Sequence, residues 1–266
     1  MKTNEFIVKR IEEAITESED SKTFVIPYGL NSKPGQFVMA WLPGAGEKPF
    51  SISGEKEGKF SITVCAVGSV SEAICKLKKG DKLGFRGPFG THFSIPKDST
   101  SLAMVGGGYG SAPLAYLAEV AINEGKKVYF IEGARTKNRL LFVERMKKAG
   151  AEVLLSTDDG SEGVKGYSTN VLKDILKTHK IDKVFTCGPE IMMKKVAQIS
   201  EEAGVPSEVS VERYMKCGFG ICGQCAIDEE GICLCTEGPI LSGKKALSLT
   251  EFGKYHRDST GKKIDW

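Results

Sequence analysis

Four closely spaced thiols near the C-terminus constrain this chain more than any other feature of its sequence. Cys217, Cys222 and Cys225 follow the spacing C-x4-C-x2-C, and either Cys233 or Cys235 can supply a fourth thiol shortly afterwards. Plant-type 2Fe–2S clusters have their ligands at this spacing. A segment of this kind must wrap around two irons, and it points to the transfer of single electrons.

The glycines between the cysteines agree with this interpretation. Gly218, Gly220 and Gly223 allow positive φ angles and a close approach of the backbone to a cluster. Backbone N–H groups in such a loop can point at sulfur and tune the cluster's potential. Four cysteines also suit a structural zinc ion, but such sites commonly use two C-x2-C pairs and this segment has one. We therefore predict a 2Fe–2S cluster, with zinc as the alternative.

Length and composition exclude several classes of protein. The 266 residues are enough for about two domains, and 41% of them are hydrophobic. A formal net charge of +3 indicates neither a nucleic-acid partner nor an acidic membrane surface. The charged N-terminus has no apolar signal core, and no apolar run approaches the ~20 residues that span a bilayer. We expect a cytoplasmic protein whose clustered cysteines bind metal rather than form disulfides.

The pattern of the chain predicts three parts. Short strand-like runs fill residues 1–97 and indicate a small β-barrel, interrupted by one helix with Ser71 as N-cap and Gly80 at its end. Residues 98–207 alternate between strands and helices, which predicts an α/β domain with a doubly wound parallel sheet. Residues 208–266 hold the cysteines and a polar tail without a core pattern, which either docks on a partner or is mobile.

Three turns at predicted strand ends indicate a nucleotide site. GGGYG lies between a strand and a helix, CGP follows another strand, and TDDGS ends a third. Glycine at the first two turns lets a pyrophosphate approach the backbone, and a helix N-terminus favours its charge. Each turn alone can also be ordinary loop chemistry, since these residue types favour turns. The candidate contacts are Gly107, Gly108, Gly110, Asp158, Cys187, Gly188 and Pro189.

Together, the motifs KPFS, GGGYG…P and CGP resemble those of the ferredoxin-reductase superfamily of flavoproteins. With TDDGS and C-G-x-G-x-C-x-x-C…C-x-x-G-P added, residues from about 5 to 241 are similar to the electron-transfer subunits of NAD-dependent (class 1B) dihydroorotate dehydrogenases. The resemblance implies FAD at the KPFS turn, NAD at the Gly-rich and CGP turns, and a cluster whose fourth ligand opens C-x-x-G-P. It therefore implies Cys217, Cys222, Cys225 and Cys235 as ligands, in place of Cys233.

The same resemblance implies which residues contact FAD. The flavin turn is Lys48, Pro49, Phe50 and Ser51, the lining strand holds Ile62, Thr63 and Val64, and Val70 and Ser71 contact the pyrophosphate. The family usually has arginine where this chain has Lys48. Lysine keeps the charge but loses the planar fork, so we expect FAD to be held less tightly. Glu132 is a candidate for the adenine ribose, and Arg135 for a nicotinamide ribose or phosphate.

The implied function is electron transfer, with no catalytic acid or base on this chain. The resemblance implies a partner subunit that carries FMN and oxidises dihydroorotate, in a heterotetramer with two subunits of each kind. Electrons then pass through the cluster and FAD to NAD⁺. One alternative is the small subunit of an NADH-dependent ferredoxin–NADP reductase, a sulfide dehydrogenase or a hydrogenase. Another is a zinc-containing nucleotide-binding module.

Overall fold

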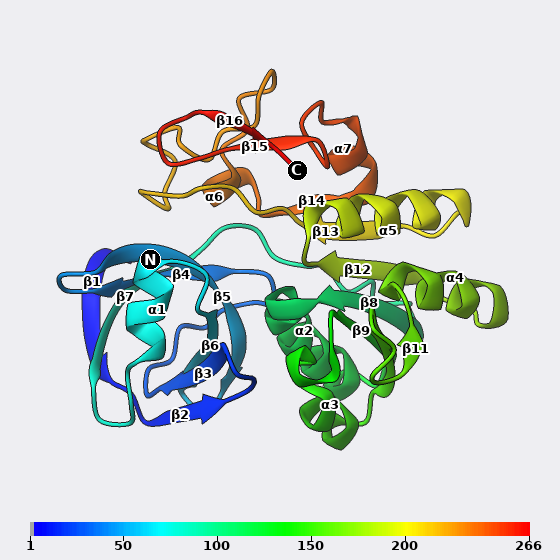
Figure 1. Ribbon diagram of the computed structural model, residues 1–266, viewed down its shortest axis with the longest axis horizontal. Helices are drawn as coiled ribbons and strands as arrows, with labels where there is room; N and C mark the ends of the chain where they lie inside the picture. Colours follow the sequence, from blue (N-terminus) through cyan, green and yellow to red (C-terminus); the bar gives the residue numbers. More distant parts are fainter. Residues whose placement is uncertain (1–2) are drawn as a thin grey trace.

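The computed structural model describes residues 3–266, which fold as three parts around a common centre (Figure 1). The first part is a curled antiparallel sheet in the order β1-β7-β4-β5-β6-β3-β2, which confirms the barrel-like fold predicted for the N-terminal part. Its elements are β1 (Thr3–Arg10), β2 (Glu13–Thr16), β3 (Ser21–Ile26), β4 (Phe37–Leu42), β5 (Gly46–Lys56), β6 (Lys59–Cys65), α1 (Ser69–Cys75) and β7 (Lys82–Phe89).

Alternation along these strands separates an inner core from an outer apolar face. On β6, Ile62 and Val64 are fully buried inside the barrel. On β4 and β7, Phe37, Met39 and Phe89 pack instead against the C-terminal part. Successive side chains of a strand point to opposite faces, so one sheet can serve two cores. The outer face is the platform on which the cysteine segment rests.

The helix predicted from Ser71 to Gly80 starts earlier and is shorter. α1 has Gly68 as its N-cap and ends at Cys75. The Ser71 hydroxyl folds back within the first turn and accepts hydrogen bonds from the N–H groups of Val67 and Gly68, at 3.0 and 3.1 Å. Ser71 therefore caps the helix from its third position, because its hydroxyl can reach free N–H groups that precede the helix.

The second part is a sheet with helices on both faces, as predicted. The elements are β8 (Ser101–Gly107), α2 (Ser111–Asn123), β9 (Lys127–Ala134), α3 (Val143–Ala149), β10 (Glu152–Thr157), β11 (Val164–Lys165), α4 (Ser168–Thr178), β12 (Lys183–Cys187), α5 (Glu190–Glu202), β13 (Ser207–Ser210) and β14 (Ile240–Ser242). The strand order is β11-β10-β9-β8-β12-β13-β14, parallel except for β14. On β8, Leu102 and Met104 pack against α2, whereas Ala103 and Val105 face the core of α4 and α5.

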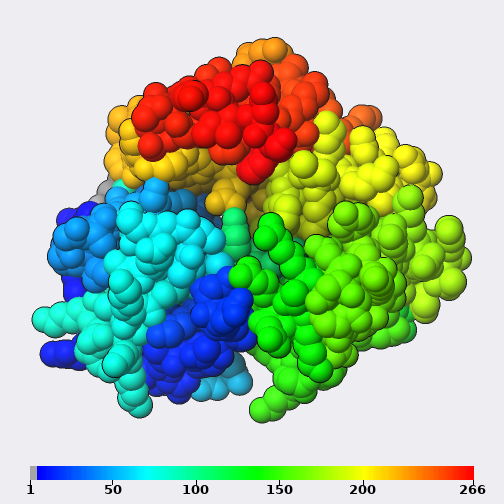
Figure 2. Space-filling view, viewed as in Figure 1, coloured from blue at the N-terminus to red at the C-terminus, as the bar shows by residue number. Residues whose placement is uncertain are grey.

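The C-terminal residues belong to both the sheet and the cysteine segment. β13 crosses the expected boundary at residue 207, and β14 extends the same sheet. The polar tail is folded: α7 (Gly243–Ser248) is followed by a hairpin of β15 (Tyr255–Arg257) and β16 (Lys263–Asp265), and Phe252 is 1% exposed. In the space-filling view this part lies across both other parts (Figure 2).

Asp228 holds the hairpin against the cysteine segment. It accepts hydrogen bonds from the Tyr255 hydroxyl at 3.0 Å and from Arg257 at 2.8 Å. Local sequence patterns did not indicate this fold, because the contacts join residues 27 and 29 positions apart in the chain. Over residues 3–266, no helix combines the length and apolarity needed to cross a bilayer.

Candidate cofactor site

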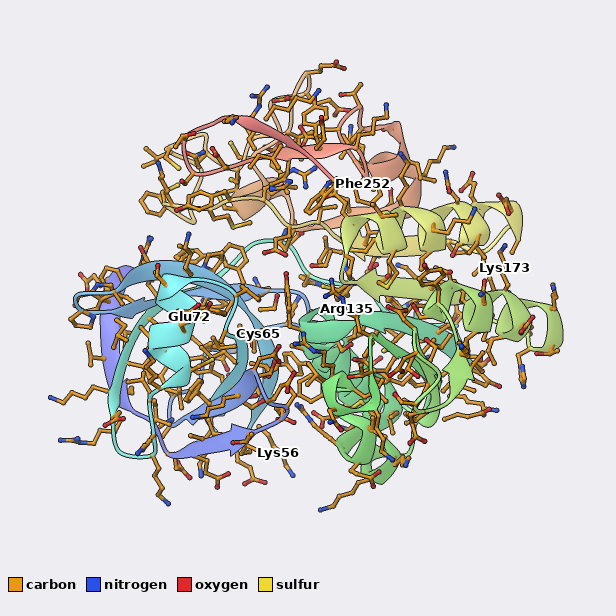
Figure 3. The ribbon with its side chains drawn as sticks, in the orientation of Figure 1. Lys56, Cys65, Glu72, Arg135, Lys173 and Phe252 are labelled. Carbon is orange, nitrogen blue, oxygen red and sulfur yellow. The ribbon has the colours of Figure 1, made fainter. Side chains whose placement is uncertain are left out.

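A cavity of about 650 Å³ lies where the three parts meet. Thr63 lines it from the barrel, Gly110 and Gly188 line it from the nucleotide part, and Glu212 lines it from the C-terminal part. Figure 3 shows Cys65, another lining residue, on the side of the barrel that faces the nucleotide part. The cavity therefore exists only when all three parts are assembled.

The barrel wall of the cavity contains most of the residues expected to contact a flavin. The KPFS residues lie on β5 rather than in a turn, and all four line the cavity. Of the three residues expected on the lining strand, Thr63 lines it, whereas Ile62 and Val64 are buried in the barrel core. Contact of Ile62 and Val64 with a flavin stays a prediction, and with both side chains in the core it would be made by the backbone of β6. The residues that line this wall are Lys48, Pro49, Phe50, Ser51, Thr63, Val70 and Ser71.

Lys48 has a partner that the sequence did not suggest. Its Nζ lies 3.8 Å from the centroid of the Tyr214 ring, in a cation–π arrangement. Tyr214 also lines the cavity and lies three residues before Cys217. The charged end of the KPFS motif is therefore held beside the segment that leads to the cysteines.

The two glycine turns of the nucleotide part touch each other. A Cβ atom on Gly110 would lie 2.5 Å from Cα of Gly188, and one on Gly188 would lie 3.0 Å from Cα of Gly107. Gly188 has a φ of 149°, a conformation that side chains rarely adopt. Only glycine fits at this approach of the GGGYG and CGP turns. Gly110, Cys187 and Gly188 line the cavity, and Gly107, Gly108 and Pro189 belong to the same two turns.

Glu132 lies beneath the Gly-rich turn and cannot receive a ribose. It is fully buried, it bonds to the Ser111 hydroxyl, and it accepts a hydrogen bond from the Leu141 N–H at 3.4 Å. Burial raises the pKa of its carboxyl to about 8, although both hydrogen bonds act to lower it. Ser111 is the first residue of α2, so Glu132 supports the start of this helix.

Asp158 lies outside the cavity but at the same edge of the sheet. It is exposed directly after β10, and β10 is separated from β8 by β9. Arg135 is exposed directly after β9 and is labelled in Figure 3. The C-terminal ends of parallel strands meet at one edge of a sheet. Asp158 and Arg135 therefore lie at the same edge as the cavity.

Tyr109 and Glu212 are cavity residues that the sequence analysis did not single out. The Tyr109 hydroxyl donates to Glu212 at 3.5 Å, and the charge of Glu212 together with burial raises the tyrosine's pKa. Burial also raises the pKa of the Cys187 thiol to about 12, so this thiol is neutral. From the tail, His256 and Trp266 line the cavity and stack at a centroid distance of 4.2 Å.

The four expected cluster ligands form two pairs. Cys217 lies beside Cys222, and burial of its thiol is outweighed by N–H groups of the following loop, which lower its pKa to about 6. Cys235 Sγ accepts a hydrogen bond from the Gly220 N–H at 3.2 Å, and the Cys235 N–H donates to Cys225 Sγ at 3.4 Å. N–H donors favour the thiolate form at Cys217, whereas burial and the neighbouring Cys225 raise the pKa of Cys235 against the effect of the Gly220 N–H.

Cys233 also lies beside Cys225, but it is partly exposed at the start of α6 (Leu234–Glu237). Cys235 and Cys225 are buried, at 1% and 2% exposure. Throughout the described part of the chain, no three Cys, His or acidic side chains converge as they would on one metal ion. Cys217 therefore has Cys222 as a neighbour, and Cys225 has both Cys233 and Cys235, whereas a two-iron cluster is held by four cysteine thiolates.

Comparison with known proteins identifies the family. A profile for the iron–sulfur cluster binding domain of dihydroorotate dehydrogenase B matches residues 212–246, and an oxidoreductase NAD-binding domain matches residues 104–198. A probable electron transfer subunit of dihydroorotate dehydrogenase B (NAD⁺) from Methanocaldococcus jannaschii is 49% identical, over 97% of this chain and 98% of that protein. The chain belongs to this family of electron transfer subunits.

Two further similarities agree with this assignment. The corresponding protein of Methanothermobacter thermautotrophicus is 40% identical over 97% of both chains. Among solved structures, a chain from an NADH-dependent reduced ferredoxin–NADP oxidoreductase superposes with a TM-score of 0.81 at 31% identity, covering 90% of this chain and 89% of that one. An electron transfer subunit of dihydroorotate dehydrogenase B is an oxidoreductase component that works with a catalytic partner.

Proposed function

We propose that this chain passes electrons from a partner subunit that oxidises dihydroorotate to NAD⁺, as a step in pyrimidine biosynthesis. The observation that carries the proposal is the common cavity. Its walls bring together the KPFS residues of β5, the glycine turns after β8 and β12, and residues 211–215, which lead directly to Cys217. Three kinds of redox group can thus be held side by side.

The barrel wall is the proposed FAD site. Lys48, Pro49, Phe50, Ser51, Thr63, Val70 and Ser71 supply it, and Lys48 provides a positive charge for an anionic cofactor. When bound, a flavin supplies the link between two-electron hydride chemistry and one-electron chemistry. The residues of this chain bind and orient, and none is assigned as an acid or base.

The two touching glycine turns are the proposed NAD site. Gly107, Gly108, Gly110 and Gly188 allow a pyrophosphate to approach the backbone at the start of α2. Cys187 and Pro189 would hold the nicotinamide end of the cofactor, and Asp158 would contact its adenosine end. The neutral thiol of Cys187 and the side chain of Glu212 offer polar contacts inside the cavity.

Cys217, Cys222, Cys225 and Cys235 are the proposed ligands of a 2Fe–2S cluster. Support comes from the pairwise arrangement of the thiols and from the N–H groups that point at Cys217 and Cys235. Gly218, Gly220 and Gly223 have φ angles of 81°, 84° and 68°, which the tight wrapping of this loop requires. The proposed partner carries FMN, in a heterotetramer with two subunits of each kind.

The test compares the activities of the isolated chain with those of its complex with the partner subunit. Purified alone, the chain should contain FAD and about two irons, and it should reduce an artificial dye with NADH without oxidising dihydroorotate. Adding the FMN partner should give NAD⁺-dependent dihydroorotate oxidation. Dihydroorotate oxidation by the isolated chain would contradict the proposal, as would full coupled activity in a folded variant without the cluster.

A second candidate is the small subunit of an NADH-dependent ferredoxin–NADP oxidoreductase. The structural similarity at a TM-score of 0.81 favours it. Co-purification of the native complex distinguishes the two functions. A partner with FMN and dihydroorotate activity supports the first, and a larger flavin and iron–sulfur subunit with ferredoxin activity supports the second.

A further inference from the structure

Arg86 is a buried cation that connects the barrel to the cysteine segment. Its side chain is 6% exposed. Nε donates to Glu47 Oε1 at 2.6 Å and Nη2 donates to Glu47 Oε2 at 3.0 Å, which makes a bidentate ion pair. Nη2 also reaches the carbonyl oxygen of Lys216 at 3.4 Å. Lys216 precedes Cys217, and Glu47 precedes Lys48.

The contacts of Arg86 lie on the outer platform of the barrel. Its guanidinium carbon is 5.4 Å from the ring of Phe219, in the cysteine segment, and 5.6 Å from that of Phe89, on its own strand. A Cβ on Gly218 would lie 2.9 Å from Met39 Cγ, so this loop rests directly on β4. Figure 1 shows the segment above this edge of the barrel.

Two contacts join neighbouring residues of β5 to the same segment. Glu47 reaches the Lys216 carbonyl through Arg86, and Lys48 lies over the ring of Tyr214. The bidentate pair with Glu47 uses Nε and Nη2, and a buried guanidinium also needs hydrogen bonds for its remaining donors. The acceptor that Nη2 reaches beyond Glu47 is the Lys216 carbonyl, so this contact fixes the position of the first cysteine relative to the KPFS residues.

We propose that Arg86 is a positioning residue that holds the cluster-binding segment on the flavin-binding barrel, and so sets the separation across which electrons move between the two cofactors. This inference rests on the proposed function. It assigns to Arg86 no contact with either cofactor. Its action passes through Glu47 on one side and the Lys216 carbonyl on the other.

The test replaces Arg86 by methionine together with Glu47→Gln, so that no carboxylate is left unpaired. Arg86→Lys, which keeps the charge without the fork, is the conservative variant. The control is Arg145→Met. Arg145 makes the same type of contact elsewhere, with Glu119 at 2.8 Å twice and with the Ser53 carbonyl at 2.8 Å, and it joins α3 to the barrel.

Two measurements on the chain with both cofactors bound test the inference: hydrogen exchange of the cysteine segment and the rate of electron transfer to the cluster. Hydrogen exchange of residues 214–223 should become faster in the double variant, with exchange of residues 83–89 unchanged. After rapid mixing with NADH, reduction of the cluster should slow by at least about tenfold relative to reduction of the flavin, since small displacements cost positioned reactions heavily. Arg86→Lys should give intermediate values of hydrogen exchange and of the cluster reduction rate. Arg145→Met should give the values of the unaltered chain in both measurements.

Unchanged exchange in residues 214–223, or unchanged cluster reduction, in a variant that holds both cofactors would overturn the inference. Equally faster exchange in residues 83–89 would also overturn it, because Arg86 would then serve only the stability of the barrel. If the unaltered chain lacks the flavin or the cluster, the proposed function fails instead, and this result is visible before any variant is compared.

Discussion

At the scale of single residues, burial and partners decide roles that residue type leaves open. Glu132 has the type and the strand-end position of a ribose ligand, yet it is buried beneath α2. Lys48 has the type of a surface lysine, yet it lies over an aromatic ring at the cavity wall. Two predictions belong to this scale.

The first concerns Glu132 and pH. Its carboxyl has a pKa of about 8 in the folded chain, against an ordinary value of 4.5. Between these values the folded state keeps a proton that the unfolded state has released. The free energy of unfolding should therefore fall as pH rises through this range, by up to about 1.4 kcal/mol per pH unit. Glu132→Gln cannot ionise and should lack this contribution.

Urea unfolding at several pH values between about 5 and 8 measures the difference between the two proteins. Glu144→Gln, on the exposed part of α3, is the control for loss of a carboxylate. Parallel pH profiles for Glu132→Gln and the unaltered chain would show that the buried carboxyl does not hold a proton.

The second prediction concerns the contribution of Lys48 to the retention of FAD by the chain. Lys48→Ala should lower the FAD content after gel filtration, because it removes the cation at the barrel wall. Lys48→Arg should keep it, since a guanidinium stacks on an aromatic ring and contacts phosphate. Lys56→Ala, at an exposed position of the same strand, is the control. Equal FAD content in all four proteins would mean that Lys48 takes no part in binding.

At the scale of elements, loops supply the chemistry and strands fix where it occurs. The cysteine loop lies on the outer face of β4 and β7, and the glycine turns follow β8 and β12. Loops positioned by a rigid scaffold commonly carry function in this way. The loop itself can be tested through its two competing thiols.

Cys235→Ser should abolish iron binding, whereas Cys233→Ser should leave about two irons per chain. The reason is that Cys235 is buried and accepts the Gly220 N–H, while Cys233 is partly exposed at the start of α6. Iron analysis and visible absorption of anaerobic preparations measure the outcome. The reverse pattern would assign the fourth ligand to Cys233, and zinc without iron would exclude the cluster.

At the scale of the whole molecule, a buried ionic network joins the nucleotide part to the C-terminal part. Arg213 bonds to Glu190, the first residue of α5, and to Glu251, both at 2.5 Å. The Gly253 N–H donates to Glu190 and the Asp228 N–H donates to Glu251, each at 2.7 Å. The network reaches from the CGP turn to the cysteine segment and the tail.

Arg213→Met should destabilise the chain by about 3–5 kcal/mol, because it leaves two carboxylates buried without a cation. Glu251→Gln should cost less, since it removes the surplus negative charge and keeps an acceptor for the Asp228 N–H. Chemical unfolding measures both values. A smaller loss for Arg213→Met than for Glu251→Gln would show that the cation is not what stabilises this junction.

Local patterns in the sequence were enough to predict the type of each part. Many short strand-like runs indicated the barrel, the alternation of strands with helices indicated a parallel sheet, and cysteine spacing indicated the cluster segment. Each of these features depends on residues that lie close together in the sequence. Family membership is confirmed as well, because it rests on motifs that are local in the same sense.

Only the tertiary structure decided which side chains share the cavity. The approach of Gly110 to Gly188, the contact of Lys48 with Tyr214 and the reach of Arg86 to Lys216 all join residues that are distant in sequence. The same holds for the folded tail and for the orientation of Ile62 and Val64 into the barrel core. Spacing fixes what a loop can bind, whereas packing between domains fixes what lies next to it.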